Sequence, residues 1–260
     1  MTVRPLLLAL AVAVLGATAM PVPACAQGTA AAQPATDKAA RLETLYDEYW
    51  EQSLKRNPLR ATFVGDPRYN DQLPNTFSKQ YRDASLAFAK KWLSTVEAVG
   101  SDGLDGQALL SYQIFVENQK QDIESAQFPD WMQPVNQFRN ILSSAVQLGS
   151  GTGAQPFKTV KDYDDWLARG SRIPVLVDQI IANMREGMAA GVVQPKVLMA
   201  KVLPQIDAII KPAAEETLFW GPVKKFPDGF SAADKERLSA GYKAMIEGEL
   251  MSAYRKLRAF

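Results

Sequence analysis

The stretch LSAGYKAMIEGELMSAYRKLRAF, residues 238–260, carries the pattern that decides the fold class. Its apolar side chains recur every three or four residues, which places them on one face of an α-helix. They are Leu238, Tyr242, Met245, Ile246, Leu250, Ala253, Tyr254 and Leu257. Because serine is a favourable residue at a helix start, we expect this helix to begin at Ser231.

The predicted helix has no residue that would end it. Helices usually close with a glycine or asparagine beyond the last apolar position, or with a proline soon after, because the last carbonyl groups need partners. Here the apolar stripe still repeats at Leu257 and Phe260. We therefore expect the surface that pairs with this helix to lie in absent residues; the alternative is a frayed terminal helix.

Six other segments show helical periodicity or helix boundary signals, and none shows the sustained alternation of a β-strand. They are expected at about 37–57, 77–100, 104–125, 135–148, 159–187 with a kink at Pro174, and 196–218 with bends or breaks at Pro204 and Pro212. The sequence thus predicts an all-α fold of seven or more amphipathic helices in an irregular antiparallel array, as an incomplete part of a larger helical fold.

The N-terminus has the organisation of an export signal. Arg4 supplies the positive end, residues 6–15 form a short apolar core, and Ala24 and Ala26 frame a cleavage site. The apolar core is too short to span a bilayer. We assign residues 1–26 to a signal peptide, 27–36 to a flexible leader and 37–260 to the helical fold, and we expect a periplasmic or secreted protein.

Cys25, the one cysteine, allows a second interpretation in which the chain is cut before Cys25 and lipid is attached there. Pro23 makes the preceding residues a poor lipoprotein signal, so this interpretation is less favoured. Under the favoured signal-peptide interpretation, the mature chain has neither cysteine nor histidine. It lacks the ligands of common zinc sites and the base of Ser-His-Asp or Cys-His catalysis. We therefore assign no catalytic, cofactor-binding or metal-binding residue.

Charge argues against two classes of partner. The chain carries 29 basic and 28 acidic residues, and Arg4 belongs to the signal, so the mature protein is neutral. Binding to nucleic acid or to an anionic membrane surface requires clustered positive charge. Neither partner is expected, and no membrane span is predicted.

Three stretches that resemble ligand sites are interpreted as structural. Asp162, Asp164 and Asp165 lack the spacing of a calcium loop and suit the first turn of a helix. The segment Gly149–Gly153 lacks the flanking strand or the Gly-Lys-Ser/Thr ending of a phosphate loop, so it is read as a mobile connection. The adjacent Glu215 and Glu216 would point in different directions from a helix, and both are read as surface residues.

A longer connection, residues 57–71, carries Asn57-Pro58, Ala61-Thr62, Gly65 and Tyr69-Asn70-Asp71. Later in the chain follow Tyr163, Trp166, Ile173-Pro174 and Arg185–Pro195. Together these motifs resemble a bacterial family known as domain of unknown function 885 (DUF885), exported helical proteins that look like zinc metallopeptidases. The resemblance implies a longer helical fold whose zinc-binding His-Glu motif lies in its C-terminal half, so zinc is implied for the full-length family alone.

Two functions are compatible with these observations. The chain is expected to be the N-terminal helical scaffold and one wall of the substrate cleft of an exported zinc-peptidase-like protein, inactive without its catalytic half. Its partner would be that missing half or a second chain, with a peptide as ligand. The alternative is a self-contained, non-enzymatic periplasmic helical module that binds a peptide or protein. The substrate-binding residues are not identified by sequence.

Overall fold

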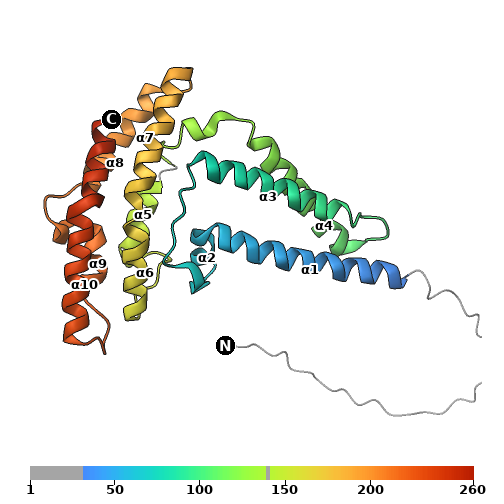
Figure 1. Cartoon of the computed structure of the whole chain (residues 1–260), viewed down its shortest axis with the longest axis horizontal. Coiled ribbons are helices and arrows are strands. Elements are labelled where there is room, and N and C mark those ends of the chain that lie inside the picture. Colours follow the sequence, from blue (N-terminus) through green and yellow to red (C-terminus); the bar gives the residue numbers. More distant parts are fainter. Residues whose placement is uncertain (1–31, 139–140) are drawn as a thin grey trace, which may run out of the picture.

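The computed structural model describes residues 32–138 and 141–260, and every regular element in these ranges is helical. Two groups of helices meet at an angle, with α1, α3 and α4 in one group and α5 to α11 in the other (Figure 1). The predicted all-α class is confirmed. Residues 1–31, which include the predicted signal peptide, Cys25 and the first half of the predicted leader, lie outside the described residues.

The first group is a three-helix unit around a small core. Its helices are α1 (Ala32–Arg56), α3 (Lys79–Glu97) and α4 (Gly106–Ser125). The Tyr49 ring lies 4.9 to 5.6 Å from the rings of Phe88, Trp92 and Phe115, and so links all three helices. Edge-to-face and stacked contacts of this kind add stabilisation beyond simple burial.

The start of α1 differs from the sequence prediction. The helix begins at Ala32, so residues 32–36 are helical although they were assigned to a flexible leader. Alanine has the highest helix propensity, and Pro34 lies in the first turn, where its missing N–H group removes no intrahelical bond. The predicted end before Pro58 is correct.

The second group surrounds the larger core. Its helices are α5 (Ile141–Gly149), α6 (Val160–Gly170), α7 (Ile173–Ala190), α8 (Lys196–Ile209), α9 (Gly221–Lys224), α10 (Ala232–Met245) and α11 (Met251–Ala259). Each of these helices contributes side chains to one continuous apolar cluster. Trp166, Tyr242 and Tyr254 are among its fully buried side chains. This group forms the main body of the molecule.

Prolines break two of the predicted helices. The segment 159–187 is not one kinked helix: α6 ends at Gly170 and α7 begins at Ile173, with Pro174 in its first turn. Proline is tolerated there because the first N–H groups of a helix have no intrahelical partner. The segment 196–218 ends at Ile209, shortly before Pro212, and continues in 3₁₀ turns, whereas Pro204 stays inside α8.

The last predicted helix begins after Ser231 as expected, but it contains a π-turn at Ile246–Leu250 between α10 and α11. Its apolar stripe is buried within the chain as far as Leu257, except that Met245 is partly buried, because α10 packs on α6 and α11 packs on α7 and α8. The absent surface predicted for this stripe is therefore not needed up to Leu257. Phe260 remains 40% exposed.

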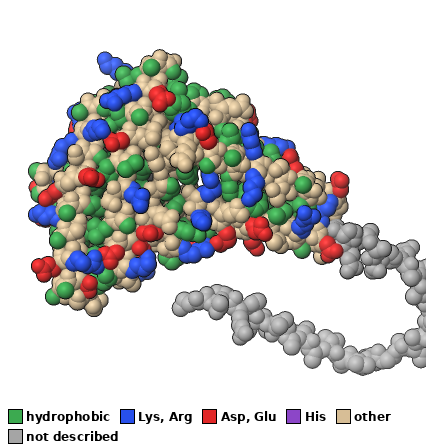
Figure 2. All heavy atoms as spheres, in the orientation of Figure 1, with side chains coloured by type: hydrophobic (Ala, Val, Ile, Leu, Met, Phe, Trp, Pro, Cys, Tyr) green, Lys and Arg blue, Asp and Glu red, His purple; other side chains and the backbone are tan. Residues whose placement is uncertain are grey.

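The surface agrees with the neutral composition. Basic and acidic side chains are interspersed over the face shown in Figure 2. None of the helices in the described ranges combines the length and apolarity needed to cross a bilayer.

Candidate functional site

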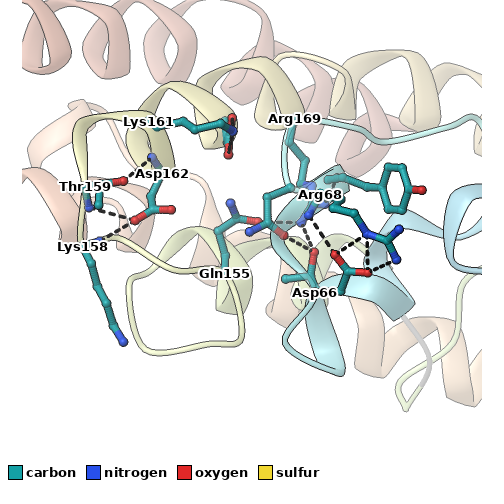
Figure 3. Close-up of polar contacts among 12 residues, drawn as sticks. Asp66, Arg68, Gln155, Lys158, Thr159, Lys161, Asp162 and Arg169 are labelled. Carbon is teal, nitrogen blue, oxygen red and sulfur yellow. Dashed lines mark hydrogen bonds and ion pairs between the residues drawn. The ribbon is translucent and has the colours of Figure 1, made fainter.

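The start of α6 shows what the three aspartates do. Thr159 is the N-cap, with its hydroxyl accepting a bond from the backbone N–H of Asp162 at 3.3 Å. The Asp162 carboxylate accepts from the backbone N–H groups of Lys158 and Thr159 at 2.9 and 2.8 Å (Figure 3). This is a capping box, in which two otherwise unpaired donors at the helix start are satisfied.

The other two aspartates of this stretch form ion pairs. Asp164 contacts Arg237 of α10 at 2.6 Å, and Asp165 contacts Lys161 one turn earlier at 2.6 Å. All three carboxylates therefore have partners in the fold, which agrees with their structural interpretation. Among the described residues, no group of three or more metal-ligating side chains lies close enough together to hold an ion.

The glycine-rich segment after α5 packs tightly, which differs from the expected mobile connection. A Cβ atom on Gly149 would lie 2.2 Å from the Trp166 ring, and one on Gly153 would lie 2.7 Å from the carbonyl oxygen of Gln147. Glycine is needed here for close approach of packed groups.

Glu215, which the sequence analysis interpreted as a surface residue, is exposed and pairs with Lys243 at 2.9 Å.

Arg169, near the end of α6, is the centre of a buried polar network that sequence reasoning missed. Only 1% of the residue is exposed, and its guanidinium donates to the carbonyl oxygens of Gln72 and Tyr69 at 3.0 and 2.6 Å. It also donates to the Thr62 hydroxyl at 2.9 Å and to the Gln155 side-chain oxygen at 2.5 Å (Figure 3). All four acceptors are uncharged oxygens.

Burial lowers the pKa of Arg169 to about 10, against the opposing effect of the Asp71 and Asp165 carboxylates. The group is still a cation at neutral pH, so its charge lies in the interior without a carboxylate in hydrogen-bond contact. A buried charge is tolerated when its polar atoms are satisfied. The four bonds provide that satisfaction.

The network anchors the connection that carries the family-like residues. Its ordered elements are α2 (Pro58–Phe63) and the 3₁₀ turn Pro67–Tyr69. The Thr62 hydroxyl lies 2.7 Å from the Asn70 side-chain oxygen, so one bond ties the two elements together and Arg169 ties both to α6. A sequence signal existed: Arg169 follows Tyr163 and Trp166 at intervals of three residues, so it occupies an apolar-face position of its helix.

An ion-pair cluster holds the outer side of the same connection. Asp66 caps the 3₁₀ turn by accepting from the backbone N–H of Arg68 at 3.0 Å, and the Arg68 side chain contacts Asp66 at 2.6 Å and Glu51 of α1 at 2.8 Å. These hydrogen bonds from Arg68 hold the pKa of the Asp66 carboxyl below its usual value. Both arrangements position the chain, and neither presents a reactive group.

A groove formed mainly by helices of the second group is the best candidate for a binding site. It has a volume of about 390 Å³ and lies between α7, α8, α11 and the 3₁₀ turn Pro129–Met132. Four methionines line it: Met132, Met184, Met188 and Met199. Lys196 is the one charged residue among the lining residues, and the lining amides Gln133 and Gln194 are hydrogen-bonded to each other at 3.2 Å.

The groove depends on the family-like segment Arg185–Pro195. Gly191 has φ 74° and ends α7 in the left-handed conformation that glycine adopts readily. The chain then folds back, with the backbone N–H of Val192 donating to the Gly187 carbonyl oxygen at 2.8 Å. A Cβ atom on Gly187 would lie 2.6 Å from the Val192 carbonyl oxygen and 2.9 Å from that of Met132. Both glycines therefore shape one end of the groove.

Apolar side chains around the groove remain open to solvent. Met188 is 62% exposed and Val193 is 54% exposed. The Phe260 ring also lines the groove, with the Arg185 guanidinium 5.4 Å from its centroid. A contiguous exposed apolar patch usually marks an interaction site. The exposed apolar side chains therefore suit binding, and the described residues that line the groove include no group of catalytic side chains.

Comparison with known proteins places this fold in context. The family model described as "Bacterial protein of unknown function (DUF885)" matches residues 58–260. No curated protein matches the chain. A solved structure described as "the putative lipoprotein from Colwellia psychrerythraea" is similar, with a TM-score of 0.69 and 19% sequence identity. The match covers 85% of this chain and 40% of that one, so the chain spans less than half the length of that protein.

Proposed function

The chain belongs to the DUF885 family of bacterial proteins of unknown function, and from this premise we propose that it is the N-terminal helical scaffold of a larger exported protein of the zinc-peptidase type. In this role it forms one wall of a substrate cleft, and the catalytic groups come from another part of the protein. The observation that supports the proposal is the match to the solved neighbour. This chain corresponds to 40% of that longer chain.

The residue chemistry supports a scaffold role. The sequence contains no histidine, so it cannot supply the imidazole ligands of a His-Glu zinc site. The polar groups around Arg169 and Asp66 form hydrogen bonds and ion pairs that hold connections in place. Zinc and the acid-base residues would therefore be bound and presented by the polypeptide that completes the fold.

The test is to purify the chain and measure hydrolysis of a peptide mixture, with added zinc and after chelation, together with bound metal by mass spectrometry. We expect neither chelator-sensitive cleavage nor stoichiometric zinc. Co-expression with a polypeptide encoded next to it that contains a His-Glu helix should restore both. Zinc-dependent cleavage by the isolated chain would overturn the proposal.

A second candidate function is a self-contained helical module that binds a peptide or protein. The observation in its favour is that both helix groups have their own buried core. This function predicts a monodisperse protein with one cooperative unfolding transition and little binding of a hydrophobic dye. Aggregation or strong dye binding would favour the scaffold.

A further inference from the structure

We propose that Met132, Met184 and Met188 form a binding site for one Cu(I) ion at one end of the groove. The inference goes beyond the proposed function, because neither the scaffold nor the helical module needs a metal held by this chain. Histidine, cysteine and carboxylate side chains form no group of three within the described residues that could hold an ion. The thioether of methionine is a further metal ligand, and because it is soft it selects Cu(I).

Two of the sulfur atoms come from one face of α7. Met184 and Met188 are four residues apart in this helix, so they are neighbours on its surface, with Cβ atoms roughly 5–6 Å apart. Both side chains line the groove. Met184 packs against the core, whereas Met188 is mostly exposed. Because the methionine side chain is unbranched and has three rotatable bonds, Met188 can turn its sulfur toward that of Met184.

The third sulfur atom is brought to the same place by the 3₁₀ turn Pro129–Met132. The Met132 Cβ atom lies 3.0 Å from the position that a Cβ atom on Gly187 would occupy. Gly187 belongs to the same turn of α7 as Met184 and Met188, and its lack of a side chain lets Met132 approach that turn closely. All three thioethers therefore start within reach of one point on the wall of the groove.

The surroundings favour a soft ion over hard ions. Apolar side chains make up most of the lining, and the lining amides Gln133 and Gln194 bond to each other. Magnesium and calcium ions need several oxygen ligands. Zinc sites use imidazole, thiolate or carboxylate ligands, and none of these lines the groove. Neutral thioethers in an apolar wall meet the needs of Cu(I) alone among these ions.

The charged side chains near the site are exposed. Arg185 and Glu186 lie between the two methionines of α7 and have opposite charges, so their fields at the site largely cancel. Successive residues of a helix are about 100° apart, so Glu186 projects away from the face of Met184 and Met188. Lys196 lines the groove from α8 and is exposed, so solvent and salt screen its charge. Within the described residues, Glu186 and Lys196 form no ion pair. The sulfur atoms, rather than these charges, therefore decide the binding.

Silver(I) is the first probe of the full chain, because it is a soft monovalent ion like Cu(I) and does not change oxidation state in air. Carbon-labelled methionine methyl groups report on each sulfur atom by NMR. One equivalent of Ag(I) should shift the resonances of Met132, Met184 and Met188 and leave that of the buried Met251 unchanged. Under anaerobic reducing conditions the chain should take one equivalent of Cu(I) from a coloured chelator, and equimolar zinc should cause no shift.

Leucine substitutions separate the sulfur atom from its packing, because leucine has a similar volume and no metal ligand. Met184→Leu and Met188→Leu should each weaken Cu(I) binding by about tenfold or more, at least the loss that follows removal of a group supporting a metal ligand. The variant with both substitutions should not bind Cu(I) in competition with the chelator. Met251→Leu is the matched control, because Met251 is buried on α11 outside the groove, and it should leave the affinity unchanged. Circular dichroism and the thermal midpoint verify that each variant is folded.

Two results would overturn the inference. One is the same Cu(I) affinity in the natural chain and in the folded variant with both leucines. The other is resonance shifts spread equally over all methionines, which would indicate adventitious binding to thioethers. Failure of the proposed function is recognised separately, because zinc-dependent cleavage by the isolated chain would refute the scaffold role and leave the Cu(I) measurements unchanged.

Discussion

At the scale of single residues, Arg169 has the strongest structural role outside the apolar core. Three of its four bonds join α6 to α2 and the connection that follows it, over separations of about 100 positions in the sequence, and the fourth reaches Gln155. Replacement by a residue without donors removes a bond from all four acceptors. The Gln72 carbonyl and the Gln155 side-chain oxygen lose the donor that they use, whereas the Tyr69 carbonyl keeps the bond from the Gln72 N–H and the Thr62 hydroxyl keeps its bond to Asn70. These acceptors, rather than the charge, dominate the cost.

We expect Arg169→Met to lower the free energy of unfolding by about 2–4 kcal/mol, because several acceptors lose a bond at once. Urea unfolding monitored by circular dichroism measures this change. Arg172→Met is the control, since Arg172 is exposed at the start of α7, and it should change stability by less than about 0.5 kcal/mol. Equal stability of the two variants would contradict the assigned role.

Asp66 provides a test of electrostatics at the residue scale. Because hydrogen bonds from Arg68 lower the pKa of Asp66, this carboxylate stabilises the fold at pH values above its unfolded-state pKa. That contribution is lost as the pH falls through the lower, folded-state pKa. Arg68→Gln should therefore raise the pKa of Asp66, as measured by carbon NMR of the carboxyl group. Arg255→Gln, on α11, should leave this pKa unchanged, and a similar response to both substitutions would count against the pairing.

At the scale of elements, two glycines at the C-terminal end of α7, Gly187 within it and Gly191 just beyond it, serve different purposes. Gly191 needs its positive φ but has open space where a Cβ atom would be, whereas Gly187 is confined by backbone atoms. Gly191→Ala should lower the free energy of unfolding by about 1–2 kcal/mol, the cost of a left-handed residue with a side chain. Gly187→Ala should cost more, because the Val192 loop must move. Thermal unfolding compares the two, and a smaller loss for Gly187→Ala would show that this loop yields easily.

The same elements show where sequence reasoning succeeds. Helix caps are local, so Ser78, Thr159 and Ser231 each begin a helix near the predicted place. Helix ends depend on neighbours as well. The π-turn at 246–250 follows a continuous apolar stripe and has no local breaker except Gly248, whose ψ of −109° lies outside the helical range. The unequal packing partners before and after this turn are not visible in the linear pattern.

At the scale of the whole molecule, the two helix groups differ in their cores. The cluster of α1, α3 and α4 contains four buried apolar residues, Leu42, Val96, Leu104 and Val116, whereas the cluster of the second group is several times larger. Segments with fewer buried contacts open more readily. The first group should therefore be the less stable part of the fold.

Hydrogen exchange measured by mass spectrometry tests this difference. Amides in the middle of α3 and α4 should exchange faster than those in the middle of α6, α7 and α10. Arg169→Met should increase exchange in α2 and the residues that follow it, where its bonds end, and change the middle of α10 least. Uniform protection across both groups would indicate a single cooperative unit instead.

The linear order of residues was enough to establish an all-α fold, most helix starts and the family, because these depend on neighbours three or four positions away and on short ordered motifs. Folding decided the rest. The network of Arg169 and the methionine-lined groove join segments from distant parts of the chain, and a pattern read along one helix does not reveal which distant backbone oxygens or side chains will surround it. That information arises only when long-range packing brings the helices together.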